Sequence, residues 1–265
     1  MIQQSHHRFE PHELDVLTSQ YRLALEPGQD PSFSLPCREL LKPERSQPYL
    51  QRVAGIFETD SMTANVSLFA KRYAYLTIAA GLFAMSRYNK ALDLTLENCT
   101  LDSYRKGEAW LPRVLLHDLS VTMPEPEQRH VWRDELIRRM FADNLERVWS
   151  ALSRDTGVSK AVLWENTAIY MYWLYENSFV EGAKGEELAR IEEDFHYLLH
   201  DAPAVLFGDR KNPLHTFNTP KRTTMVSETP IRVRKTCCLY YLAADEPDDY
   251  CPTCPKLKHG AASCI

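Results

Sequence analysis

Four cysteines are concentrated near one end of the chain, in the stretch RVRKTCCLYYLAADEPDDYCPTC. Two of them are adjacent, a spacer of twelve residues follows, and the other two form a Cys-x-x-Cys pair. They are Cys237, Cys238, Cys251 and Cys254. Because thiolates bind zinc and iron and also exchange with disulfides, this segment is where the sequence is best equipped for chemistry.

Three kinds of site use four thiols in this order. A structural zinc ion takes four thiolates at the corners of a tetrahedron, usually from two Cys-x-x-Cys pairs. Cys237 and Cys238 lack that spacer, and on a strand adjacent side chains point to opposite faces, so they fit a single ion poorly. A [2Fe–2S] cluster also takes four thiolates, and its two irons can use diverging neighbours. Cys251 and Cys254 alone could form a redox dithiol, but only a short tail follows them, with no room for a βαβ unit.

The overall composition limits the classes of function. Hydrophobic residues make up 44% of the 265 residues and charged residues 25%, which is ordinary for a soluble globular protein. The net charge of −5 argues against nucleic-acid binding. The first residues contain no apolar signal segment, and the longest uncharged apolar run, Tyr73 to Ser86, is too short to span a bilayer. We therefore expect a cytoplasmic protein, where clustered cysteines more often bind metals or do redox chemistry than form structural disulfides.

The elements that must position this segment are mainly helices. Apolar residues recur at spacings of three and four, which predicts helices over residues 13–25, 66–91, 128–154, 160–179 (with Ser159 as cap) and 185–200. Five prolines indicate a loop over residues 27–48. Strands are predicted on either side of Gly107 and in the segments 223–228 and 230–242.

These elements predict an α+β fold that is mostly helical, with a small antiparallel sheet built from the 94–121 hairpin and the 222–242 strands. A C-terminal cysteine-rich cluster module completes it. The helical part and the cysteine segment are joined by only about 20 loop residues, so we treat the chain as a single domain carrying this module.

The order of the motifs resembles the FhuF-like family of ferric-siderophore reductases. Basic residues before an adjacent cysteine pair, IRVRKTCCLYY, and the following Cys-x-x-Cys carry the main likeness. Three weaker motifs fall in the same order as in that family: KALDL at 90–94, the Trp-x-Asn-Thr helix in VLWENTAIYMYWLY at 162–175, and KNPL at 211–214. The family spacer is usually about ten residues rather than twelve; the acidic loop AADEPDDY can absorb the difference at little entropic cost.

The resemblance implies a [2Fe–2S] cluster held by Cys237, Cys238, Cys251 and Cys254. It also implies one-electron reduction of siderophore-bound Fe(III) to Fe(II), which releases the iron in the cytoplasm. No catalytic residue beyond the cluster is expected, and the sequence contains no G-x-S-x-G, H-E-x-x-H, Walker A or G-x-G-x-x-G motif. Residues 1–220 would form the siderophore-binding region and residues 221–265 the cluster-binding module.

Three cations precede the cysteine pair and are candidates for binding the substrate. On a strand from Pro230 to Leu242, Arg232 and Arg234 would share one face and Lys235 would lie on the other. Positive charge here would favour the reduced cluster and could dock an anionic ferric chelate. The other interpretation is a strand face whose charges are paired with nearby carboxylates.

The implied partners are a ferric siderophore and an external electron donor, either a ferredoxin or a reduced flavin, because no flavin or nicotinamide motif is present. We expect no nucleic-acid partner, and peripheral association with a membrane stays open. The alternative function is a zinc-stabilised, non-enzymatic protein that binds a siderophore or another protein.

Overall fold

The computed structural model describes residues 8–28, 30–107, 109–244, 246 and 249–257. Its centre is α3 (Met62–Phe83), which runs on into the π-helical turn η3 (Ala84–Tyr88). Apolar residues surround most of this helix, so it is buried almost throughout. Ser61 caps its start by accepting a hydrogen bond from the Ala64 backbone N–H at 3.3 Å. The predicted buried helix over 66–91 is thus confirmed, with its start four residues earlier.

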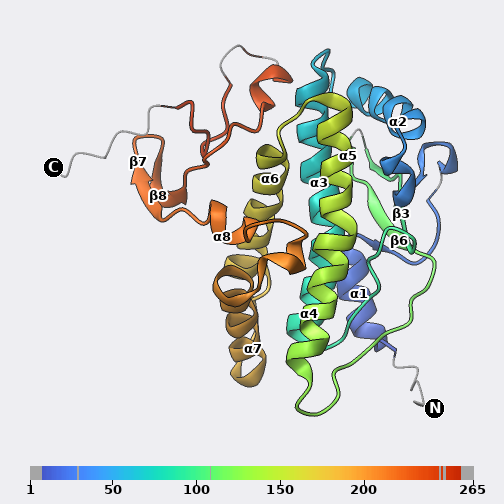
Figure 1. Cartoon of the computed structure of the whole chain (residues 1–265), viewed down its shortest axis with the longest axis vertical. Helices are drawn as coiled ribbons and strands as arrows, with labels where there is room; N and C mark the ends of the chain where they lie inside the picture. Colours follow the sequence, from blue (N-terminus) through green and yellow to red (C-terminus); the bar gives the residue numbers. More distant parts are fainter. Residues whose placement is uncertain (1–7, 29, 108, 245, 247–248, 258–265) are drawn as a thin grey trace.

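The long helices lie side by side around α3 (Figure 1). The predicted helix over 128–154 is α4 (Arg129–Met140), the π turn η4 (Phe141–Glu146) and α5 (Arg147–Thr156), which ends at Gly157 with a φ of 74°. The next predicted helix is α6 (Lys160–Trp173) with η5 (Leu174–Ser178), and Ser159 caps it as expected. Helix α6 packs along α3, and both begin at the same end of the bundle.

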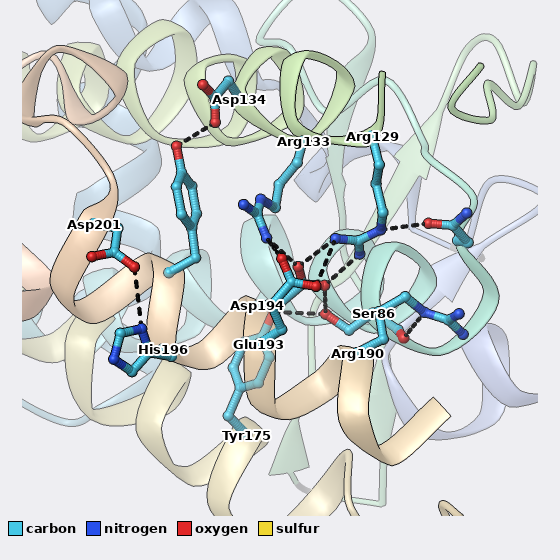
Figure 2. Close-up of polar contacts among 12 residues, drawn as sticks. Ser86, Arg129, Arg133, Asp134, Tyr175, Arg190, Glu193, Asp194, His196 and Asp201 are labelled. Carbon is cyan, nitrogen blue, oxygen red and sulfur yellow. Dashed lines mark hydrogen bonds and ion pairs between the residues drawn. The ribbon is translucent and has the colours of Figure 1, made fainter. Parts of the chain in front are cut away.

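The helix predicted over 185–200 is α7 (Gly185–His196), followed by η6 (Tyr197–Asp201). A buried ionic network fastens it to the bundle (Figure 2). Asp194, fully buried, accepts both terminal nitrogens of Arg129 at 2.8 and 2.7 Å and one of Arg133 at 3.0 Å. The short helices η7 (Ala204–Phe207) and α8 (Pro213–Phe217) then lead back toward the start of α6.

The N-terminal part covers the other side of the bundle. It contains α1 (Pro11–Gln20) and α2 (Pro43–Ile56), together with the 3-10 turns η1 (Pro31–Phe33) and η2 (Cys37–Leu41). The prediction of a loop over 27–48 is wrong at its end, because Pro43 occupies the first position of α2, where its missing N–H costs no hydrogen bond.

The sheet is mixed rather than purely antiparallel, which corrects the sequence-based expectation. The order is β1 (Leu23–Ala24), β6 (Arg113–Leu116), β3 (Cys99–Asp102) and β2 (Leu35–Pro36), with β1 parallel to β6. Strands β3 and β6 form the predicted antiparallel pair, with Leu101 opposite Val114. A minimal hairpin of β4 (Arg105–Lys106) and β5 (Ala109–Trp110) surrounds Gly107.

The C-terminal strands do not join this sheet. β7 (Lys221–Thr224) and β8 (Ser227–Arg232) form a separate hairpin with Lys221 opposite Arg232, on the opposite side of the bundle from β3 and β6 (Figure 1). The fold class is therefore confirmed as mostly helical α+β with a clustered cysteine segment, whereas the joining of the 222–242 strands to the 94–121 hairpin is wrong. Across the described residues, no helix combines the length and apolar character needed to cross a membrane.

Candidate metal centre

The cysteine segment is bent rather than extended. Strand β8 ends at Arg232, and Leu239 takes a left-handed backbone conformation with a φ of 62° before the 3-10 turn η8 (Tyr240–Leu242). This bend turns the Leu239 backbone N–H back toward the Sγ atom of Cys237, at 3.4 Å. The expectation of a strand from Pro230 to Leu242 is wrong: strand pairing stops at Arg232, and the positive φ of Leu239 excludes extended structure there as well.

The bend brings all four predicted cysteines together as two pairs. The Sγ atoms of Cys237 and Cys254 lie 3.7 Å apart, and those of Cys238 and Cys251 lie 3.9 Å apart. Two thiolates bound to one tetrahedral metal ion with bonds of about 2.3 Å are separated by about 3.8 Å. Each pair therefore has the spacing of two ligands of a single metal ion.

The four sulfurs do not converge on one point. Among the described residues, no group of three or more Cys, His, Asp or Glu side chains is arranged to hold a single metal ion. The two adjacent cysteines belong to different pairs, so the four thiols suit a centre with two metal ions better than one tetrahedral zinc. A [2Fe–2S] cluster fits this donor set.

A buried carboxylate of α6 holds the chain just before the cysteines. Glu165, 1% exposed, accepts the backbone N–H groups of Lys235 and Thr236, both at 2.7 Å. It also accepts the hydroxyl of Thr236. Because Thr236 directly precedes Cys237, this carboxylate fixes where the cysteine pair begins.

A second set of contacts ties the two halves of the cysteine segment together. The Arg234 guanidinium donates to the Asn166 side-chain oxygen at 2.7 Å, and the Arg234 backbone N–H donates to the Thr253 carbonyl at 2.9 Å. Ser67, near the start of α3, donates its hydroxyl to the Cys238 carbonyl at 2.7 Å. Hydrogen bonds from the starts of α3 and α6 thus hold the cysteine segment in place.

Positive charge lies close to the buried side of the centre. The pKa of the Cys238 thiol is lowered to about 4, first by its hydrogen bond with Cys251 and then, against the effect of burial, by the charges of Lys71 and Arg234. Burial raises the pKa of Cys237. Cations beside one thiolate compensate part of the negative charge that four thiolates bring to a metal centre.

The three predicted substrate residues occupy different environments. Arg232 pairs with Glu176 at 2.8 Å and lies over the ring of Tyr172. Arg234 is 6% exposed, and its guanidinium group is already hydrogen-bonded to Asn166. Lys235 is exposed, although its ammonium group donates to the Thr216 carbonyl. Of the three residues, Arg234 is the one whose contacts place it beside the cysteines. Binding of a substrate by any of the three stays a prediction.

A cavity of about 270 Å³ lies beside the cysteines. Thr253, between the two residues of the Cys-x-x-Cys pair, forms part of its wall together with Arg232, Lys221 and Glu176. Trp173, half of whose surface is exposed, forms another part. Arg232 is thus the predicted substrate residue that faces a space next to the centre.

The sequence-based reasoning missed Glu165 and Asn166. Both are polar residues inside the apolar run AVLWENTAIYMYW of a buried helix. A buried charge or amide is almost always hydrogen-bonded, so two of them side by side in such a helix indicate a nearby segment that needs anchoring. The two polar residues were visible in the sequence, but their types and positions do not identify the segment that they anchor.

Comparisons with known proteins agree with this geometry. Residues 67–228, more than half of the chain, match the family model described as a ferric iron reductase FhuF-like transporter, and residues 234–256 match the FhuF 2Fe-2S C-terminal domain. Among curated proteins, none matches the sequence.

A solved structure, that of the aerobactin synthetase IucC from a hypervirulent pathotype of Klebsiella pneumoniae, is similar over 68% of this chain, with 17% identity and a TM-score of 0.45. This chain spans only 35% of that protein. The family matches carry the assignment: the chain belongs to the FhuF-like ferric iron reductase family, and its cofactor is a [2Fe–2S] cluster.

Proposed function

We propose that this protein reduces siderophore-bound Fe(III) to Fe(II) by one electron, with Cys237, Cys238, Cys251 and Cys254 as the ligands of its cluster. The observation that carries the proposal is the spacing of the sulfurs, 3.7 Å in one pair and 3.9 Å in the other. When bound, a [2Fe–2S] cluster supplies transfer of one electron at a time, which matches the reduction of one ferric ion.

The same spacing supports an assignment of ligands to irons. We assign Cys237 and Cys254 to one iron and Cys238 and Cys251 to the other. Cys238 and Cys254 are each 1% exposed, whereas Cys237 and Cys251 are only partly buried. Each iron would therefore have one buried and one more accessible ligand.

The ferric chelate is best placed in the 270 Å³ cavity beside Thr253. Lys221 and Arg232 share the single carboxylate of Glu176, so one positive charge is left to attract an anionic chelate. The exposed ring of Trp173 offers an apolar surface for the organic part of the chelate. A larger cavity, of about 470 Å³, includes Ala91 and Leu92 and lies past the far end of α3, roughly 30 Å along the bundle from Ser67. That distance makes it a poor place for exchanging electrons with the cysteine segment.

The other charged residues act on the protein itself in this proposal. Arg234 is buried, so we assign it to holding the cysteine segment and compensating its negative charge. The electron enters from an external donor, a ferredoxin or a reduced flavin, and leaves to the ferric ion. Fe(II) binds hard oxygen ligands more weakly than Fe(III), so no bond of the chelator needs to break. No disulfide joins the described cysteines, which suits a reducing cytoplasm.

The first experiment is an ultraviolet–visible spectrum of anaerobically purified protein, repeated after dithionite and again after a ferric siderophore and a ferrous trap are added. We expect visible bands that bleach with dithionite and return with the chelate, together with trapped Fe(II). A colourless protein with stoichiometric zinc would overturn the proposal. A coloured protein that no ferric chelate reoxidises would keep the cluster and overturn the activity.

The assignment of ligands has its own test, which does not depend on turnover. Each of the four cysteines is replaced by serine, and Mössbauer spectra of the 57Fe-loaded variants are compared. C237S and C254S should alter the signal of the same iron, and C238S and C251S that of the other. C99A, which removes a buried thiol outside the segment, should leave both signals unchanged. Any other pairing of effects would contradict the assignment.

A further inference from the structure

A second cavity near the cysteine segment is positively charged. Its volume is about 280 Å³, and it lies between the first turn of α6 and the segment 209–217. Three cations line it, Lys160, Arg210 and Lys211, against one acid, Asp209. In a chain whose net charge is −5, this local excess of positive charge points to an anionic ligand.

Two of these cations are available to a ligand. The Lys160 ammonium group already donates to Glu146 at 2.8 Å. Arg210 and Lys211 are exposed and form no ion pair with any described residue. The start of α6, where Ala161 also lines the cavity, adds the positive end of a 14-residue helix.

A buried hydrogen-bond donor at the same cavity lacks an acceptor. Trp164 lines the cavity and is only 2% exposed, and its indole N–H has no partner among the described residues. Buried donors of this kind are nearly always satisfied by protein, water or ligand. An acceptor atom that reached this N–H from the cavity would meet that need, and oxyanions are the acceptors that the neighbouring cations select.

The cavity also adjoins the cysteine segment. Thr216, in its wall, accepts a hydrogen bond from the Lys235 ammonium group through its carbonyl. Glu165, the residue after Trp164, holds the backbone of Lys235 and Thr236. The cavity wall and Glu165 beside it are therefore hydrogen-bonded to Lys235 and Thr236, the two residues that precede Cys237.

We propose that this cavity binds a small molecule through an oxyanion group, a carboxylate or a phosphate, using Arg210, Lys211 and the indole N–H of Trp164. The apolar part of the ligand would lie against Phe217 and Pro213, which also line the cavity. The oxyanion can come from two sources: the carboxylate of a small organic acid, or the phosphate of a nucleotide. This site goes beyond the proposed reduction and does not depend on it.

Calorimetric titration of the cluster-loaded protein with inorganic phosphate, citrate, flavin mononucleotide and riboflavin tests the proposal. At least one of the three anions should bind, and the double variant R210Q/K211Q should weaken that binding about tenfold or more, because two charge-assisted hydrogen bonds are lost. The matched control R8Q/K184Q removes the same charge from exposed residues elsewhere and should change affinity less than about twofold.

The two sources are separated by the ligands themselves. If flavin mononucleotide binds more tightly than riboflavin and citrate, the site is supported and its anion is a phosphate. If citrate binds most tightly, the site is supported and its anion is a carboxylate. No binding by any of the anions overturns the proposal, as does equal weakening by the two double variants.

The role of Trp164 has a direct readout. In a 15N-labelled sample, the indole N–H signal that is missing from W164F should move downfield when the anion binds, and the other tryptophan indoles should stay in place. An unmoved Trp164 signal at saturation overturns its part as a donor. Neither measurement involves reduction of a chelate, so this proposal and the proposed function can fail separately.

Discussion

At the scale of single residues, the cysteine segment depends on one buried carboxylate. Glu165 accepts three hydrogen bonds from two consecutive residues, Lys235 and Thr236, immediately before Cys237. Both of its oxygens act as acceptors only. Glutamate can accept at both oxygens, whereas glutamine cannot, because its side-chain amide has an NH₂ donor in place of one oxygen acceptor.

The substitution Glu165→Gln tests this dependence. The new NH₂ group would face a donor of the cysteine segment, so we expect the free energy of unfolding to fall by about 1–3 kcal/mol. Iron content per chain should fall as well, because the cysteine pair loses its fixed starting point. Chemical denaturation and iron analysis measure the two effects. Glu192→Gln, an exposed change on α7, is the control, and an equal response of both variants would contradict the role of Glu165.

At the scale of elements, the long helices were predictable because their apolar residues recur at helical spacing, from α3 to α7. Helix α2 was not predictable in this way, since Pro43 and Pro48 both look like loop residues. The strand predicted from Pro230 to Leu242 already ends at Arg232, and Leu239 takes a left-handed conformation that its residue type does not indicate. The four candidate cysteines could be identified from their residue type, whereas the pairing of their sulfurs could not, because it depends on that bend.

The network in Figure 2 allows a sharp comparison between two neighbouring acids of α7. Asp194 is fully buried between Arg129 and Arg133, whereas the Glu193 side chain is 62% exposed and reaches Arg133 at 2.9 Å. Asp194→Asn removes the buried counter-charge of Arg129 and Arg133 and should cost about 3–5 kcal/mol of unfolding free energy. Glu193→Gln should cost at most about 1 kcal/mol. Urea unfolding measures both, and equal losses would show that burial of the network does not matter.

The hairpin β7–β8 is held to η5 by Glu176, which accepts from Arg232 and Lys221 at 2.8 and 2.7 Å. Burial pushes the pKa of Glu176 upward, but the two hydrogen-bonded cations outweigh it and lower that pKa below its usual value. The carboxylate therefore stabilises the fold at pH values above its unfolded pKa of about 4.3, and this contribution is lost as the pH falls through the lower, folded pKa.

The variant Glu176→Gln should therefore be less stable than the wild type by about 1 kcal/mol at pH 7. The difference should shrink toward zero as the pH falls below about 4. Denaturant unfolding from pH 7 to pH 3 measures it. Glu228→Gln, an exposed change on the same hairpin, should show no such trend. A Glu176→Gln difference that stays constant with pH would contradict the ion pairs.

At the scale of the whole molecule, the apolar core and the cysteine segment are separate. The residues of the core cluster come from the helices and the mixed sheet, and none of the four cysteines of the metal centre is among them. Hydrogen bonds between protein groups attach the segment to α3 and α6. The fold of the helical body should therefore not depend on the metal.

Removal of the iron should leave the far-ultraviolet circular dichroism and cooperative unfolding of the protein in place. Amide hydrogen exchange should speed up in residues 233–257 and stay unchanged in α3, α4 and α6. Loss of helical signal or of cooperativity after iron removal would contradict the separation. Reconstitution with iron and sulfide should restore protection in the same segment, which serves as the control.

The uneven burial of the cysteines has a kinetic consequence. Among the described residues, Cys238 and Cys254 are covered and Cys237 and Cys251 are partly exposed, so the centre meets the solvent on the side of the latter two. The donor and the ferric chelate would have to use that one edge in turn. Steady-state rates should then follow a double-displacement pattern, with parallel lines in double-reciprocal plots and mutual inhibition when either partner is in excess. Intersecting lines would mean that both partners are bound at once, through two separate surfaces.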